Sequence, residues 1–127
     1  MFYSCKLLSS ITFNCVITSI GDYQFYGFDN VTSIVIPDSV TDVTYKSFAE
    51  SKKLLNIDVP DDLESIDGTA FDGTAWWDAQ ADGVVYLENY LYGYKGEMPE
   101  GTEVIVKDGT ILIASYAFNN EHNLKSL

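Results

Sequence analysis

The apolar positions of this chain return at a fixed interval of 23 residues. The segment 31–37 places apolar residues at its first, fourth and sixth positions and a proline at its seventh, and the segment 54–60 repeats that pattern. The segment 8–13 keeps the apolar spacing, with Asn14 in place of the proline. A fixed period of roughly 20–29 residues with L-x-x-I-x-I spacing is typical of leucine-rich repeats. The pattern therefore predicts an α/β solenoid built of coils of about 23 residues.

Other positions keep the same interval, which tests it independently. They are Ile17, Val40 and Leu63, then Ile20, Val43 and Ile66, and finally Phe2, Phe25, Phe48 and Phe71. The next equivalent of Phe71 is Phe118, which lies 47 residues on (118 − 71), or two intervals plus one residue. One coil, at about 72–101, has therefore been rewritten without loss of the register.

Each repeat unit divides into three pieces. Thr32–Ile36 alternates polar and apolar residues and is rich in β-branched side chains, which predicts a short strand in a parallel ladder. Pro37 lacks an amide donor and ends the pairing at a corner. Val40–Val43 is a second short extended stretch with two inward apolar residues. Tyr45–Lys52 has Phe48 at its centre and good helix formers around it, which predicts one or two short helical turns.

The rewritten coil has a different chemistry. Its segment Gly83–Gly96, GVVYLENYLYGYKG, predicts two strands meeting at Glu88 and Asn89, an inserted β-hairpin. Residues 103–107 then resume the ladder, and Asp108 and Gly109 form the corner. The hairpin is therefore predicted to be an outgrowth on the solenoid.

The length of 127 residues corresponds to one domain. Both Met1 and Leu127 fall in the middle of a repeat unit, and neither end shows the polar capping repeat that closes a solenoid. We therefore expect 1–127 to be a single leucine-rich repeat domain, truncated in mid-repeat at both ends. Its uncapped ends would be open to self-association, because unpaired ladder edges recruit other chains.

The charge balance narrows the range of partners. Nineteen acidic residues face seven lysines and no arginine, so the net charge is −12 and nucleic acid is not expected as a partner. No apolar run reaches the roughly 20 residues of a membrane helix, so we expect no membrane insertion. Apolar residues of Met1–Val16 fall in repeat register, which favours the end of a coil over a signal peptide.

The sequence offers little that could support catalysis or metal binding. His122 is the only histidine, and no nucleophile or orienting carboxylate can be placed beside it. Phosphate-loop and zinc-ligand spacings are missing, so we expect no catalytic residues and no cofactor. A disulfide between Cys5 and Cys15 is disfavoured but open, because their positions fall on different sides of a coil.

One stretch comes close to a calcium-binding loop. Asp78, Gln80, Asp82 and Gly83 follow the D-x-D-x-D-G spacing, but Gln80 replaces an aspartate and the closing Glu88 is one residue early. We interpret the aspartates as turn formers and expect no metal site.

The dipeptides at the corners and turns point to a family. They are Ile20-Gly21, Ile36-Pro37, Val59-Pro60, Ala70-Phe71 and Ala117-Phe118. With them the whole chain resembles the BspA-type leucine-rich repeat family of bacterial cell-surface proteins, and its inserted element resembles a variant of that family. The resemblance implies a secreted or cell-surface protein that adheres to host proteins or other cells, with no catalytic residues to transfer.

Aromatic residues of the rewritten coil form the densest candidate binding site. The predicted binding residues are Trp76, Tyr86, Tyr90, Tyr92 and Tyr94. Exposed aromatic rings of this kind would stack on sugars or anchor a protein. In the alternative interpretation they pack the hairpin onto the coil, and Trp77, which is in register with Leu54, belongs to the core. The sequence thus predicts a non-enzymatic module that binds an extracellular protein or glycan ligand, with a structural spacer or a carbohydrate-binding hairpin as alternatives.

Overall fold

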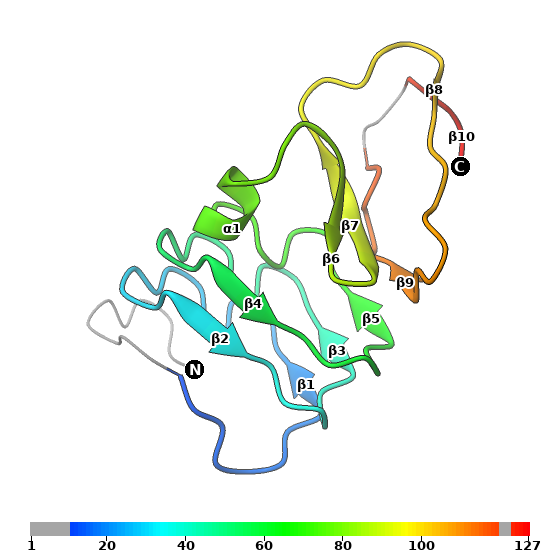
Figure 1. Ribbon diagram of the computed structural model, residues 1–127. Helices are drawn as coiled ribbons and strands as arrows, with labels where there is room; N and C mark the ends of the chain where they lie inside the picture. The colour runs from blue at the N-terminus through cyan, green and yellow to red at the C-terminus, as the bar shows by residue number, and fades with distance from the viewer. Residues whose placement is uncertain (1–10, 120–122) are drawn as a thin grey trace.

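The computed structural model describes residues 11–119 and 123–127, so Phe2, Cys5 and His122 lie outside the described residues. Short strands dominate it, and the single four-residue helix of the described chain lies beside the β-hairpin (Figure 1). The elements are β1 (Ser19–Ile20), β2 (Ser33–Val35), β3 (Asp42–Val43), β4 (Asn56–Asp58), β5 (Ser65–Ile66), α1 (Ala75–Asp78), β6 (Gly83–Leu87), β7 (Tyr90–Lys95), β8 (Thr102–Glu103), β9 (Leu112–Ile113) and β10 (Leu124–Ser126).

Two parallel ladders follow the interval of the sequence. Strands β2 and β4 pair with Ser33 opposite Asn56, a separation of 23 residues (56 − 33). Strands β1, β3 and β5 form a second ladder, in which Ser19 lies opposite Asp42 and Asp42 opposite Ser65. The predicted short parallel ladders are therefore confirmed, and they fit a repeat fold.

The helical turns expected at Tyr45–Lys52 are wrong, because residues 45–50 form non-helical turns. Lys46 and Glu50 have φ angles of 49° and 61°, in the left-handed region, which an α-helix does not tolerate. Amide groups here point to the neighbouring unit instead of back along the chain. Phe48 N–H donates to the carbonyl of Ala70 at 2.9 Å, for example. Pairing between units has thus replaced the local helical bonds.

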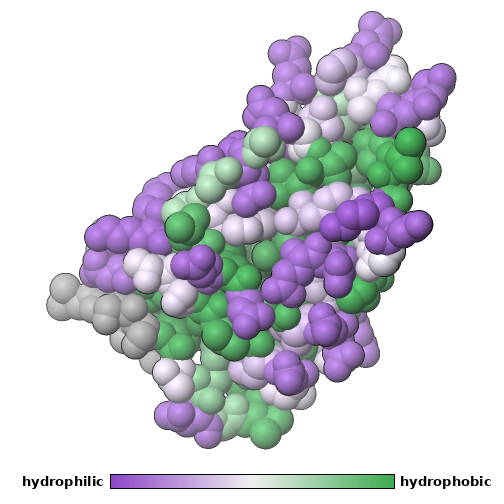
Figure 2. All heavy atoms as spheres, in the orientation of Figure 1, coloured by the Kyte–Doolittle hydropathy of each residue, from purple (hydrophilic) through white to green (hydrophobic). Residues whose placement is uncertain are grey.

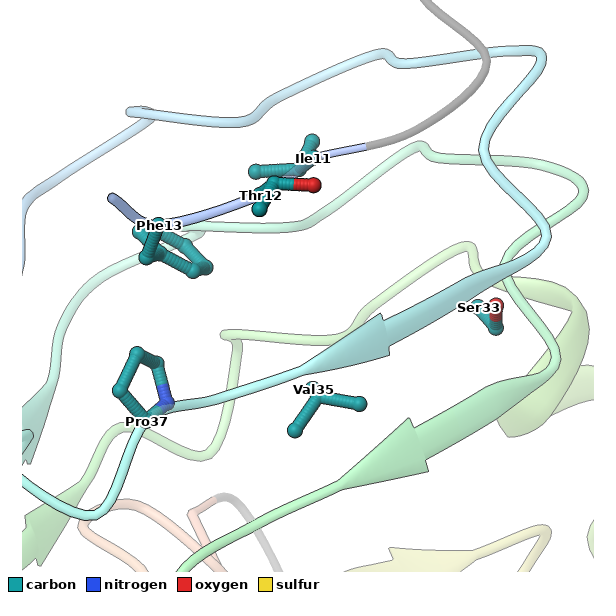
Figure 3. Close-up of a pocket in the computed structure, with 6 residues that line it drawn as sticks. All are labelled: Ile11, Thr12, Phe13, Ser33, Val35 and Pro37. Atoms are coloured by element: carbon teal, nitrogen blue, oxygen red, sulfur yellow. The ribbon is translucent and has the colours of Figure 1, made fainter.

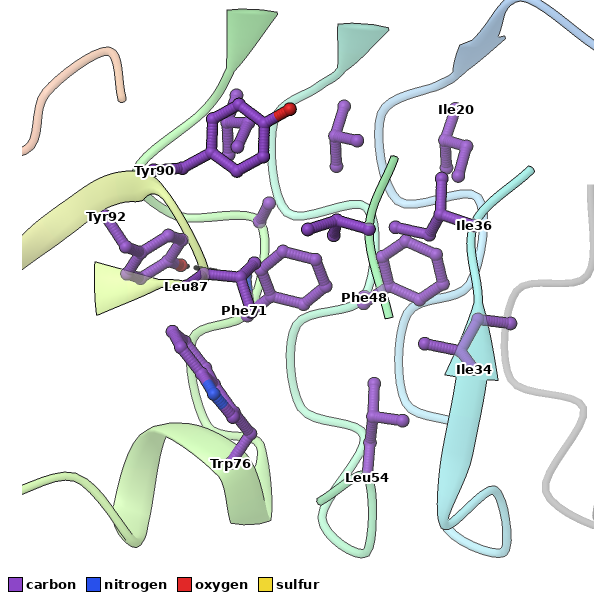
Figure 4. Packing of buried hydrophobic residues seen from close by; sticks show 14 of the residues in the cluster. Ile20, Ile34, Ile36, Phe48, Leu54, Phe71, Trp76, Leu87, Tyr90 and Tyr92 are labelled. Atoms are coloured by element: carbon purple, nitrogen blue, oxygen red, sulfur yellow. Dashed lines mark hydrogen bonds between the residues drawn. The ribbon is translucent and has the colours of Figure 1, made fainter. Parts of the chain in front are cut away.

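The core is a stack of equivalent side chains (Figure 4). The ring of Phe48 lies 5.2 Å from that of Phe25 and 5.4 Å from that of Phe71, with interplanar angles of 18° and 11°. The equivalent residues Ile20 and Val43 are also buried. Each unit has only one apolar edge, so stacking of the units creates the core.

The predicted β-hairpin is present, but it is not an outgrowth. Strands β6 and β7 pair antiparallel, and the outer side of β7 pairs in parallel with β9, so β7 lies inside a three-stranded sheet. Val85, Leu87 and Leu91 are buried. Because these side chains belong to the core, the hairpin takes the place of a repeat unit.

After the hairpin the chain returns to parallel pairing in a changed form. Only Thr102–Glu103 of the strand expected near 103–107 is formed, and it pairs with β10 and not with β4. The β5 unit is reached instead by Ser115, whose carbonyl accepts Gly68 N–H at 2.7 Å. A Cβ atom on Gly68 would lie 2.5 Å from that oxygen, so only glycine allows this approach.

Candidate functional site

Three of the five predicted binding residues are buried. The exposed fractions of Trp76, Tyr90 and Tyr92 are 8%, 0% and 1%, which leaves their rings no surface for a ligand. Exposure was the premise of their selection, and for these three it is wrong. Their burial favours the alternative, in which the aromatic residues attach the hairpin to the preceding unit.

Tyr92 ends the phenylalanine stack. Its ring lies 5.9 Å from that of Phe71 and 5.1 Å from that of Trp76 (Figure 4). Its hydroxyl oxygen accepts the backbone N–H of Phe71 at 2.9 Å. Burial, assisted by the nearby charge of Asp72, raises the pKa of the Tyr92 phenol well above its ordinary value. Tyr92 is therefore a neutral packing residue that also satisfies a buried amide.

Tyr90 enters a corner of the preceding unit. In an undisturbed corner Val40 N–H donates directly to the carbonyl of Pro37 at 3.0 Å. At the equivalent corner the Tyr90 hydroxyl accepts Leu63 N–H at 3.2 Å and donates to the carbonyl of Pro60 at 2.5 Å. A phenol has thus been inserted into the turn, and the hairpin is attached through it.

The remaining predicted residues, Tyr86 and Tyr94, are half-buried, as is Trp77, which packs against the core as expected. The Tyr86 hydroxyl accepts Lys107 N–H at 2.9 Å, and the Lys107 ammonium lies 4.3 Å from the centre of the Tyr86 ring. Tyr86 therefore connects the hairpin to the segment that follows it. Ligand binding by Tyr86 and Tyr94 stays a prediction.

The stretch that resembles a calcium loop is organised around a lysine. The Lys95 ammonium donates hydrogen bonds to the carbonyls of Trp77, Asp78 and Gln80 at 3.0, 3.0 and 2.8 Å. These carbonyls lie at the C-terminal end of α1, where a positive charge is favoured. Within the described residues no group of three or more His, Cys, Asp or Glu side chains is placed to hold a metal ion.

The two remaining candidates are only partly accessible to description. Cys15 is exposed and free, but Cys5 and His122 lie outside the described residues, so the interpretations of both stay predictions. In the described ranges no helix has the length and apolar character needed to cross a bilayer.

A cluster that sequence reasoning missed lies on two neighbouring turns. We call Tyr23, Tyr26, Tyr45 and Lys46 the tyrosine cluster. The Tyr23 ring lies 5.4 Å from that of Tyr26 and 5.5 Å from that of Tyr45, both edge to face, and the Lys46 ammonium lies 5.5 Å from the Tyr45 ring. The signal was present in the sequence, because Lys46 follows Tyr23 by one interval and so had to lie beside it.

A groove opens beside β2. It has a volume of about 450 Å³, and its sides are the segment 11–13 and the outer edge of β2 (Figure 3). The residues that line it are Ile11, Thr12, Phe13, Ser33, Val35 and Pro37. The Val35 side chain is 64% exposed, and apolar atoms gather on this part of the surface (Figure 2).

Short parallel strands that recur every 23 residues, with a matching stack of rings, define a repeat protein. Residues 1–98 match the BspA type leucine rich repeat region, with six copies of the repeat, so the chain belongs to the BspA-type leucine-rich repeat family. Comparisons with curated proteins and with solved structures give no match.

Proposed function

We propose that this chain is a non-enzymatic binding module that attaches to an extracellular protein, in adhesion to host or other cells. The groove beside β2 carries the proposal, because a structural spacer has no need of an apolar recess next to an exposed strand edge. The family supports it as well, since BspA-type repeat proteins are typically secreted or held on the cell surface. We infer that the units continue as a solenoid, which would present an extended surface.

The groove suits an extended segment of a partner protein. Alternate backbone groups of β2 pair with β4, which directs those of Ser33 and Val35 toward the groove. No hydrogen bond joins these two residues to the described segment 11–13. An added strand would obtain backbone hydrogen bonds from this edge and apolar contacts from Val35 and Phe13. The partner is therefore proposed to bind by strand addition.

The proposal is tested by binding of the purified chain to a panel of extracellular matrix proteins at physiological salt. Two variants serve as a pair, Val35→Asp in the groove and Val16→Asp outside it. Val16 is 83% exposed and does not line the groove, so it controls for the added charge. Saturable binding that is lost only in Val35→Asp supports the proposal. Absence of binding to every protein by the folded chain would favour the spacer, and equal loss in both variants would place the site elsewhere.

The carbohydrate-binding alternative at the hairpin has lost its main support. Tyr90 and Tyr92 cannot stack on a sugar while their side chains are buried. The hairpin is therefore proposed to complete the fold.

A further inference from the structure

The tyrosine cluster is unusual because its rings lie on the surface and not in the core. Tyr45 is 40% exposed, and Tyr23 and Tyr26 are half-buried. The phenylalanines of the same units, Phe25 and Phe48, already fill the interior with 2% and 1% exposure. Core packing therefore does not account for three more aromatic rings on these turns.

Polar groups accompany the rings. A hydrogen bond with Tyr45 is the main cause of the raised pKa of the Tyr23 phenol, and a further hydrogen bond joins Lys46 to Tyr45. The ion pairs among the described residues join Lys52 to Glu50 and Lys125 to Glu103, so the Lys46 ammonium has no carboxylate within salt-bridge distance. The cluster thus combines ring surface with a connected row of hydroxyl and ammonium groups.

The backbone at the cluster is held in a costly conformation. Tyr23 and Lys46 have φ angles of 56° and 49°, in the left-handed region that glycine adopts without penalty. For residues with a Cβ atom this region costs about 1 kcal/mol or more. Large side chains at these two equivalent positions are therefore not explained by the turn, and such strain is concentrated at functional sites.

We propose that the tyrosine cluster binds a neutral sugar unit of a glycan. A sugar ring has an apolar face of C–H groups and a rim of hydroxyls, and the cluster offers aromatic rings beside phenol and ammonium groups that can bond to such a rim. The net charge of −12 disfavours an anionic glycan, because its long-range field repels negative ligands. Tyr45, the most exposed ring, is the stacking residue.

This inference rests on the proposed function only in that the chain is a binding module. Its site and ligand class are different, since the tyrosine cluster shares no residue with the groove beside β2. Protein binding lost in Val35→Asp and glycan binding lost in Tyr45→Ala can therefore succeed or fail separately.

The test uses the whole chain against neutral polysaccharides built of glucose, mannose, galactose or N-acetylhexosamine, with a sialylated glycan and a sulfated one as anionic arms. Tyr45→Ala removes the stacking ring. Tyr116→Ala is the matched control, because Tyr116 is 67% exposed, has a left-handed φ of 62° and has no ring partner among the described residues. Chemical denaturation establishes that each variant is folded, and Tyr45→Phe, which keeps the ring, replaces Tyr45→Ala if the latter is not.

We expect one neutral polysaccharide to bind, with a dissociation constant at least tenfold weaker in Tyr45→Ala and unchanged in Tyr116→Ala. If Tyr45→Phe must be used, loss of the hydroxyl is expected to weaken binding about threefold. The inference is overturned if no neutral glycan binds, if only the anionic glycans bind, or if the Tyr45 variant binds as the unaltered chain does.

Discussion

The hydroxyl oxygen of Tyr92 accepts the backbone N–H of Phe71 at 2.9 Å, in a position that a main-chain carbonyl occupies in the earlier units. Phe25 N–H donates to the carbonyl of Ser47 at 2.7 Å, and Phe48 N–H donates to that of Ala70 at 2.9 Å. The row of main-chain hydrogen bonds between units therefore ends on a side chain. This exchange allows a hairpin to replace a unit without leaving a buried amide unsatisfied.

The exchange predicts that Tyr92→Phe destabilises the fold although the ring is kept. Phe71 N–H would lose its acceptor in a buried site, which costs about 1–3 kcal/mol. Chemical denaturation measures the loss. Tyr94→Phe is the control, because Tyr94 is half-buried and accepts no such bond. Equal stability of the two variants would mean that the Tyr92 hydroxyl is dispensable.

Tyr90→Phe is expected to cost less than Tyr92→Phe. When the Tyr90 hydroxyl is removed, Leu63 N–H can close directly on the carbonyl of Pro60, as Val40 N–H does on that of Pro37. The buried groups then satisfy each other, and we expect a loss below about 1 kcal/mol. The two variants are compared in the same denaturation series. A larger loss for Tyr90→Phe would show that this corner cannot close.

The repeat interval made the ladders and the phenylalanine stack predictable, because a fixed period places equivalent residues side by side whatever their detailed conformation. The location of the hairpin could not be read in the same way. Tyrosine has an apolar ring and a polar tip, so a row of tyrosines suits an exposed surface as well as a core that lacks hydrogen-bond acceptors. Only the main-chain groups left open by the preceding unit, such as Phe71 N–H, decide between the two.

The helical turns at 45–50 failed for a related reason. Helix propensity describes a segment that forms its own hydrogen bonds, whereas here Phe48 and Glu50 donate to the next unit. The tyrosine cluster was missed because attention went to the densest aromatic run in the sequence, while Tyr23 and Tyr45 are separated along the chain and meet only through the repeat. Tertiary contacts overrode local preference in both cases.

Phe48→Ala is expected to destabilise the fold by about 3–5 kcal/mol, the cost of deleting a buried phenylalanine. Phe48 is sandwiched between Phe25 and Phe71, so the resulting cavity cannot close easily. Equilibrium unfolding in urea gives the value. A loss of less than half of the lower figure would mean that the stack contributes little to stability.

Lys95→Met is expected to loosen the contact between α1 and the hairpin. The three carbonyls of Trp77, Asp78 and Gln80 would lose a charged donor, at a cost of about 1–3 kcal/mol. Hydrogen exchange should show faster exchange in α1 and at the start of β6. Lys107→Met serves as the control, because Lys107 is exposed and its ammonium contacts only the Tyr86 ring. Identical exchange in both variants would contradict a clamping role for Lys95.

Asp72 predicts a stability that rises as the pH falls below neutrality. Burial raises the pKa of its carboxyl in the folded chain, although Lys46 and the hydrogen bond from Tyr92 partly oppose the shift. Between the unfolded value of about 3.9 and the raised folded pKa, the folded state binds more protons, so lowering the pH through this window stabilises it. Glu88, whose pKa is also raised by burial, acts in the same direction. Denaturation midpoints from pH 7 to pH 4 should therefore rise, and they should rise less in Asp72→Asn, which keeps the shape and removes the charge. Parallel curves for the two proteins would show that the Asp72 carboxyl titrates alike in the folded and unfolded states.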